Sequence, residues 1–327
     1  ARNENQPAGS INLTSALTGE VAVSGKGFTY TFSNSTGALT SMLIDDQEML
    51  VSPLQFNLWR APLANEIDRW NGYSMRNSRW KEGYDATLAT DYYSNGIDQL
   101  QKKLLEFEAH AESDRMVIHV RELILTRNGQ LQFSMLDKYL HGLTLSGFEC
   151  ISDYSILPDG TIELNHSILP QGNMPRMLPR IGLSLMLQND LSLASWYGRG
   201  PQENYPDRQS GYKVGIYQSG IDDLYEPYLI PQDYGLRTGI RWLRMVDQTG
   251  RGLQFSMDKL FNFNAYPFTT EQLTRALYPF QLTRAEGNTL NLDYETTGVG
   301  DTALPVLDSY RVYPQRMNRK ITIKPLW

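Results

Sequence analysis

The sequence predicts an all-β fold of many antiparallel strands with few short helices, and three local patterns indicate it. Aromatic residues recur at every second position in residues 28–32, so they share one face of a strand. Gly, Asn, Asp and Pro end such runs at short intervals. Asn128-Gly129 between two runs is typical of a two-residue hairpin. About 15 or more strands favour two large stacked sheets over a small sandwich.

The expected strands share alternating apolar and polar residues closed by turn residues. Residues 99–108 also suit a helix, but we assign a strand because alternating segments follow. Thr269, with Gln272 three residues later, forms a capping-box pattern that predicts a short helix. No fixed repeat is present, which disfavours a propeller or solenoid. The expected strands cover residues 28–32, 38–44, 99–108, 116–125, 130–139, 161–168, 181–187, 253–257, 290–294 and 320–323.

Composition and charge exclude several classes of protein. The chain has 327 residues, 41% of them hydrophobic, and a net charge of -6 without a long run of either sign, so nucleic acid is not an expected partner. No segment has the apolar length of a membrane span or the pattern of a signal peptide, so we expect a soluble protein, cytoplasmic or periplasmic. Cys150 is the only cysteine, which rules out an intrachain disulfide and a zinc site of several cysteines.

Residues 196–208 form the most concentrated polar and aromatic segment, and we interpret them as a shaped polar loop. Its glycines and prolines favour irregular backbone, and its side chains offer the hydrogen bonds and ring faces that sugar recognition requires. The structural alternative is that Arg199, Glu203, Asp207 and Arg208 form a charge network that braces two sheets. Composition alone favours this alternative.

Glu203 and Asp207 are the carboxylates in this segment that could act as a glycosidase pair, which needs two carboxyl groups roughly 5 to 10 Å apart. Their spacing of four residues suits one helical face, but Pro201 and Pro206 argue against a helix there. Residue type is thus the only support for a catalytic role. The histidines show no metal-ligand spacing, and we expect surface or core positions for His110, His119, His141 and His166.

Two other segments have loop chemistry that could reach a ligand. Residues 59–66 end a strand-like run in a proline turn and then present Asn65 and Glu66, although a surface loop without function is an equal alternative. Residues 228–239 contain Arg237, which could anchor a carboxylate or sugar hydroxyls, or form an ordinary ion pair.

Taken in order, these stretches resemble the C-terminal domain of glycoside hydrolase family 2 β-galactosidases. The resemblance spans about residues 20–312 and implies a β-supersandwich, the galactose mutarotase-like fold, over residues 21–327, with residues 1–20 as an N-terminal linker or tail. The matching motifs are Arg60-Ala61-Pro62-Leu63, Pro179-Arg180-Ile181-Gly182, Gly200-Pro201-Gln202-Glu203-Asn204-Tyr205-Pro206-Asp207-Arg208, Pro227-Tyr228, Gly235-Leu236-Arg237, Ala285-Glu286-Gly287 running on to Leu290-Asn291, and Gly298-Val299-Gly300.

The resemblance implies a non-catalytic domain or small subunit that closes one side of the active site of a TIM-barrel domain. In that family the two catalytic glutamates and the magnesium and sodium ligands belong to the barrel, which works with retention. No eightfold alternation of strands and helices occurs here, so we expect no catalytic residue, metal or cofactor in this chain. Expected partners are the remaining domains or large subunit, in an oligomer, and a β-galactoside substrate. The candidate substrate-binding residues are Asn65, Glu66, Arg199, Glu203, Asn204, Tyr205, Asp207, Arg208 and Arg237.

The sequence departs from the family after Gly298-Val299-Gly300, where a tryptophan that stacks on the sugar is expected. That position falls on Ala303 or Leu304. Trp70 or Trp80 could substitute from another direction. Two other functions stay open: a free-standing aldose epimerase of the mutarotase-like fold, which needs a convergent acid and base, and a carbohydrate-binding module.

Overall fold

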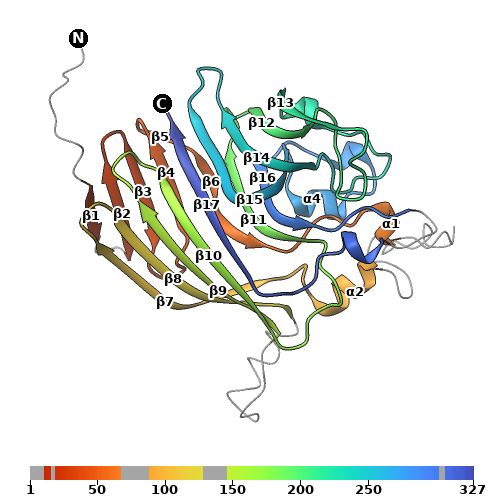
Figure 1. Cartoon of the computed structure of the whole chain (residues 1–327), viewed down its shortest axis with the longest axis horizontal. Coiled ribbons are helices and arrows are strands. Elements are labelled where there is room, and N and C mark those ends of the chain that lie inside the picture. The colour runs from red at the N-terminus through yellow and green to blue at the C-terminus, as the bar shows by residue number, and fades with distance from the viewer. Residues whose placement is uncertain (1–10, 16–18, 68–87, 128–145, 302–305) are drawn as a thin grey trace.

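The computed structural model describes residues 11–15, 19–67, 88–127, 146–301 and 306–327. Within these ranges the chain forms two antiparallel sheets of five and twelve strands with only short helices (Figure 1). The predicted all-β supersandwich of many antiparallel strands is therefore confirmed. The smaller sheet lies at one end of the molecule beside β7 to β10, and β11 to β16 lie at the other end (Figure 1).

The smaller sheet keeps sequential order and follows the predicted alternation. In β3 the residues Phe28, Tyr30 and Phe32 are buried and their neighbours are partly exposed, as period two requires. Asn12–Ser15 pairs with the next strand although it falls within the segment predicted as a linker, so ordered structure begins before residue 21. The strands are β1 (Asn12–Ser15), β2 (Glu20–Gly25), β3 (Phe28–Ser33), β4 (Leu39–Ile44) and β5 (Gln47–Glu48).

The larger sheet does not keep chain order. Its longest path runs β13-β12-β14-β15-β17-β10-β9-β8-β7, and a branch leaves β15 through β16 and β11 to β6. The strands are β6 (Leu50–Asn57), β7 (Gln101–Ala111), β8 (Met116–Leu125), β9 (Gly147–Ile156), β10 (Ile162–Gln171), β11 (Arg180–Gln188), β12 (Leu193–Gly200), β13 (Lys213–Gly220), β14 (Arg237–Val246), β15 (Gly252–Tyr266), β16 (Gly287–Thr296) and β17 (Met317–Leu326).

One hydrophobic core joins the two sheets. Phe32 of the small sheet contacts Tyr154 of β9 edge to face, with ring centroids 5.2 Å apart. The hydroxyl of Tyr30 donates to the carbonyl of Gly160 at 2.7 Å, so this buried polar group is satisfied across the interface. The same core continues through β11 to the fully buried Trp196 of β12.

The helices are short and lie in the connections. The predicted cap at Thr269 is confirmed, because its hydroxyl accepts from the Gln272 amide and the Gln272 side chain returns the bond. None of the helices in the described ranges has the length and apolar character needed to cross a bilayer. The helices are α1 (Ala64–Ile67), α2 (Leu88–Asn95), α4 (Thr270–Arg275) and the 3-10 turns η3 (Asp222–Leu224), η4 (Pro279–Gln281) and η5 (Asp308–Tyr310).

Two sequence interpretations need correction. Residues 196–200 belong to strand β12 rather than to a loop, so Arg199 is held at a fixed register beside Val214 of β13. Arg237, assigned to a loop, is the first residue of β14. Glycine occurs within strands as well as in loops, so Gly198 and Gly200 do not by themselves indicate a loop. The hairpin at Asn128-Gly129 and the strand at 130–139 lie outside the described residues.

Candidate functional site

Three segments distant in sequence meet around the backbone of residues 299–300. The Asp207 carboxylate accepts hydrogen bonds from the amides of Val299 at 3.0 Å and Gly300 at 2.7 Å. A guanidinium nitrogen of Arg208 donates to the Gly300 carbonyl at 2.6 Å, and the Asn65 side-chain amide donates to the Val299 carbonyl at 3.3 Å. Three predicted site residues therefore converge on one turn and fix its position.

Glycine is required in this turn for two reasons. A Cβ atom at Gly298 would lie 2.5 Å from the Asp207 side-chain carbon, well inside contact distance, and Gly300 has φ of +70°. This geometry does not suit a phosphate site. The amides that could bind an external anion already hold the Asp207 carboxylate.

Glu66 is buried and forms an ion pair with Arg60. The two side chains are at most 1% exposed and meet at 2.7 Å. The second carboxylate oxygen of Glu66 accepts the Leu63 amide at 2.9 Å, and the first also accepts the Tyr92 hydroxyl at 3.1 Å. Arg60 in turn donates to the Thr297 carbonyl at 2.9 Å. Glu66 therefore closes the turn at 60–66 and is not accessible to a ligand in this conformation.

Glu203 has both carboxylate oxygens engaged. One accepts the Tyr228 hydroxyl and the other accepts the Gly235 amide at 2.8 Å. Burial raises the pKa of Glu203 above its ordinary value, although these hydrogen bonds oppose the shift. Because each oxygen is directed into the protein, Glu203 connects three chain segments and is not positioned as a free catalytic acid.

Asn204 and Tyr205 follow Glu203 in the same loop and are buried. The Asn204 side-chain oxygen accepts the Thr238 amide at 3.1 Å and its hydroxyl at 2.5 Å. The Tyr205 ring packs between Leu63 and Leu236, so it links the loop to the 60–66 turn. Both residues position the loop, and their substrate-binding role stays a prediction.

Arg237 is buried but makes no ion pair within the described ranges. Its guanidinium donates to the Pro201 carbonyl at 3.1 and 3.2 Å and to the Gly235 carbonyl at 2.7 Å. It also lies over the Trp196 ring, 5.7 Å from the centroid. Burial lowers its pKa from the ordinary arginine value. The ion pair considered from sequence is thus replaced by bonds to backbone carbonyls.

The charge network considered from sequence is not formed as expected. No ion pair joins Arg199, Glu203, Asp207 and Arg208, all of them described residues. The last three bind backbone groups instead, and Arg199 lies on the opposite, partly exposed side of β12. The motif therefore braces loops through the backbone rather than through paired charges.

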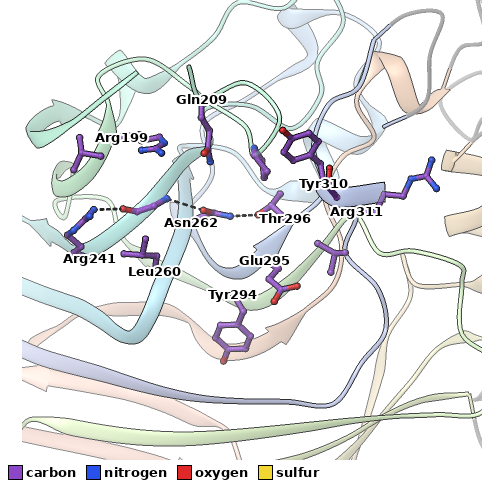
Figure 2. A pocket seen from close by; sticks show the side chains of 15 residues that line it. Arg199, Gln209, Arg241, Leu260, Asn262, Tyr294, Glu295, Thr296, Tyr310 and Arg311 are labelled. Atoms are coloured by element: carbon purple, nitrogen blue, oxygen red, sulfur yellow. Dashed lines mark hydrogen bonds between the residues drawn. The ribbon is translucent and has the colours of Figure 1, made fainter. Parts of the chain in front are cut away.

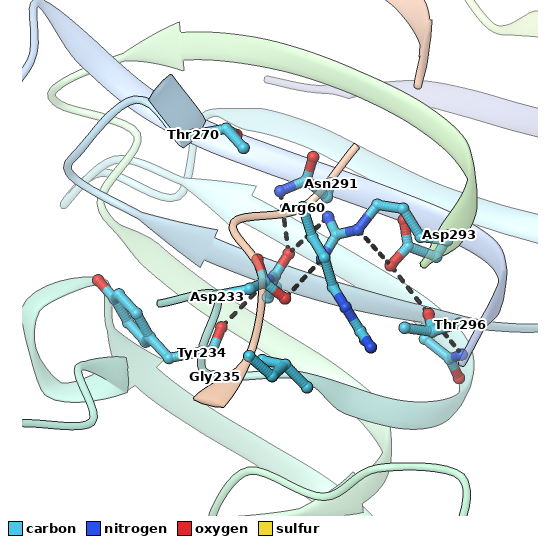
Figure 3. Close-up of polar contacts among 12 residues, drawn as sticks. Arg60, Asp233, Tyr234, Gly235, Thr270, Asn291, Asp293 and Thr296 are labelled. Carbon is cyan, nitrogen blue, oxygen red and sulfur yellow. Dashed lines mark hydrogen bonds and ion pairs between the residues drawn. The ribbon is translucent and has the colours of Figure 1, made fainter. Parts of the chain in front are cut away.

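A fully buried charge cluster lies deeper, and the sequence analysis missed it (Figure 3). Arg180 pairs with Asp233 at 2.7 Å and lies 3.7 Å from Asp293, and all three side chains are 0% exposed. Asn264 donates to Asp233 at 3.0 Å. Burial raises the pKa of Asp293 to about 6, despite the nearby Arg180. Arg180, Asp233 and Asp293 come from three segments that are distant in sequence, so no local pattern shows that they meet. The one local sign is Asp293, an acidic residue that is buried between Leu292 and Tyr294 of β16.

The histidines and metal-ligand candidates give no second site. His166 is buried and its Nδ1 lies 2.7 Å from the Tyr294 hydroxyl, while burial lowers its pKa to about 3. No group of three or more His, Cys, Asp and Glu side chains in the described part of the chain could hold a metal ion. His141 lies outside the described residues. So do Ala303 and Leu304, at the position of the expected stacking tryptophan, and Trp70 and Trp80, which could substitute for it.

Comparison with known proteins decides the family. A family model described as "Beta galactosidase small chain" matches residues 24–323. The chain belongs to the β-galactosidase small-chain family. The resemblance found in the sequence motifs is thereby confirmed.

Relatives named "Beta-galactosidase" match most of the length of this chain in sequence. One from Priestia megaterium is 26% identical over 310 residues, covering 94% of this chain and 26% of the relative. One from Vibrio cholerae is 28% identical over 269 residues, covering 82% of this chain and 23% of the relative. The chain therefore spans about a quarter of the length of these relatives.

Solved structures show a distant likeness. A galactose 1-epimerase from Lactobacillus acidophilus NCFM matches with a TM-score of 0.48 and 10% identity, covering 97% of this chain and 98% of the epimerase. A likeness this distant carries no argument about function.

Proposed function

We propose that this small-chain domain is the non-catalytic part of a retaining β-galactosidase. In this proposal a TIM-barrel domain elsewhere in the enzyme supplies the two catalytic carboxylates and binds the terminal β-galactoside. The observation that carries the proposal is the family match over residues 24–323 of a chain that spans about a quarter of its relatives. The carboxylates of the motif fit this role, since Glu203 and Asp207 hold the fold rather than face a ligand.

The structure supports a positioning role for the turn at 298–300. Asp207 and Arg208 bond its amides and carbonyl, and Asn65 approaches from a third segment. Such bonding fixes a surface that could close one side of a neighbouring active site without rearrangement. Arg208 is exposed and Asn65 is partly exposed, and these two residues are our candidates for contact with the substrate or the barrel.

In this proposal magnesium and sodium are bound by the barrel, as the resemblance implies; the described residues of this chain contain no group of three or more His, Cys, Asp and Glu side chains that could hold a metal ion. No step that involves them is assigned to its side chains. The contribution of the domain is to bind, orient and exclude water at the edge of the active site.

The test compares the isolated chain with the chain combined with its catalytic domains. The chain alone should not hydrolyse a chromogenic β-galactoside above background, and the combination should. Glu203→Gln in the isolated chain is the control for residual turnover. Hydrolysis by the chain alone that disappears in this variant contradicts the proposal, as does mutarotation of galactose by the chain alone.

A further inference from the structure

A separate pocket opens on the exposed face of β12, β14, β15 and β16 (Figure 2). Its volume is about 510 Å³, within the range of small-molecule sites. Arg199 and Arg241 come from neighbouring strands, Asn262 forms part of the wall, and Tyr310 lies at the rim (Figure 2). Pro206, which belongs to the family motif at residues 200–208, borders it. The pocket is therefore next to the family motif but uses other side chains.

Two guanidinium groups in this pocket have no carboxylate partner. Neither Arg199 nor Arg241 has an acidic oxygen within 4.0 Å in the described structure. The Nε atom of Arg199 is buried and makes no hydrogen bond to the described protein. Arg241 donates to the Gly239 carbonyl at 3.1 Å and lies over the Tyr197 ring at 4.7 Å, which orients it and leaves its charge uncompensated.

The other charged groups of the pocket are already paired. Arg311 contacts Asp308 at 2.5 Å, and Glu295 contacts Arg319 at 3.3 Å. The net positive charge of the pocket therefore comes from the unpaired guanidinium groups of Arg199 and Arg241. Planar guanidinium groups match carboxylate and sulfate oxygens in geometry, so the charge favours an anion.

The remaining lining favours a sugar over a bare ion. Asn262 is fixed, since it accepts the Gly239 amide at 3.3 Å and donates to Thr296 at 3.2 Å. Gln209 faces the same space; its side-chain nitrogen donates to the Thr238 hydroxyl at 3.0 Å, and its side-chain oxygen can accept from a sugar hydroxyl. Tyr310 offers a partly exposed ring at the rim (Figure 2). The volume far exceeds that of one inorganic anion, so most of the pocket would contact the rest of the ligand.

We propose that this pocket binds a saccharide that carries an anionic group. Arg199 and Arg241 hold the carboxylate or sulfate, and the sugar ring lies toward Gln209 and Tyr310. The ligand class thus differs from the neutral β-galactoside of the proposed function, and the two proposals are independent. The pocket would let the enzyme attach to an acidic polysaccharide outside its active site.

The first experiment measures binding to the full chain by calorimetry and ligand-observed NMR. The probes are galacturonate, galactose 6-sulfate, methyl β-galactoside and inorganic sulfate. Both acidic sugars should bind, with the neutral galactoside and sulfate alone at least about tenfold weaker, since each lacks one set of contacts. Equal affinity for sulfate would mean an adventitious ion only, and no binding of either acidic sugar at millimolar concentration would equally overturn the proposal.

The second experiment uses matched arginine variants. Arg199→Gln and Arg241→Gln should each weaken binding of galacturonate by about tenfold or more. Arg244→Gln is the control, because Arg244 lies on the same strand as Arg241, is likewise exposed and likewise stacks on an aromatic ring, but lies outside the pocket. It should change affinity less than about twofold.

An equal loss in Arg244→Gln would show that general surface charge binds the probe, which contradicts a built site. Tyr310→Ala separates the sugar from its charge: it should weaken both acidic sugars and leave sulfate unaffected. Equal affinities in this variant and the wild type would refute the assigned ring contact. Thermal melting of each variant verifies that the fold is retained.

Discussion

Asp293 gives the sharpest test of the buried charge cluster, because its environment opposes ionisation. One oxygen accepts the Thr296 hydroxyl at 3.0 Å and lies 3.7 Å from Arg180, but the other is buried without a hydrogen-bond partner among the described residues. Burial outweighs the attraction of Arg180 and raises the pKa from 3.8 to about 6. Asp293→Asn keeps the shape of the side chain and removes its charge.

The expected magnitude follows from linkage between protonation and folding. The difference of about two pKa units corresponds to about 3 kcal/mol. The folded chain holds the proton more tightly than the unfolded chain, so the contribution of Asp293 to stability is complete below about pH 4. It is lost as the pH rises through about 6. Wild type should therefore lose up to about 3 kcal/mol relative to Asp293→Asn between about pH 4 and pH 7.

The assay is urea unfolding of both proteins across this pH range, with the free energy of unfolding of each obtained by linear extrapolation. The difference between the two proteins isolates Asp293 from all other titrating groups. Asp258→Asn removes an exposed carboxylate and is the control for the effect on stability of losing one negative charge. A difference that stays constant with pH, or that favours wild type as the pH rises, refutes the reasoning.

Three other changes test the contacts around the candidate site. Glu66→Gln should lower the free energy of unfolding by about 3 to 5 kcal/mol, because it leaves Arg60 buried without its carboxylate, as measured by urea unfolding. Gly298→Ala should displace Asp207 and lower the melting temperature, with a loss of roughly 1 to 3 kcal/mol from overpacking. Thr269→Ala should cost about 1 kcal/mol by removing the cap of α4, measured in the same way.

Controls for the first two changes lie in exposed parts of the chain. Glu271→Gln breaks an exposed ion pair with Arg275 and should change stability by less than about 1 kcal/mol. Gly211→Ala adds a methyl group where no heavy atom lies within 4 Å, so it should have little effect. Losses equal to those of Glu66→Gln and Gly298→Ala would contradict the assigned causes.

The local alternation of apolar and polar residues predicted the strands well, because the residues that alternate between the two faces of a sheet are neighbours in the sequence. The segment at 99–108 was ambiguous by composition, and it forms β7, whose pairing with β8 decides the matter. Pattern failed at β12, where Gly198 and Gly200 lie within the strand and Pro201 follows it, since glycine occurs within strands as well as at their ends. The cap at Thr269 could be predicted because both partners lie within three residues.

The candidate site was only partly predictable, because its bonds join distant segments. The motif marked Asp207 and Arg208, but nothing local shows that their partners are the backbone of Val299 and Gly300. The pairing of Arg180 with Asp233 likewise spans separate elements. The pocket beside Arg199 requires the sheet order, in which β14 pairs with β12 and β15 pairs with β14.

The position of β17 bears on how this chain is made. It is the last of the described strands to be synthesised, yet it lies inside the large sheet and bonds β15 on one side and β10 on the other. During translation β7 to β10 and β12 to β16 emerge before β17, so β10 and β15 each lack one hydrogen-bonding neighbour until residues 317–326 have left the ribosome. Removing these ten residues would therefore split the sheet rather than trim it.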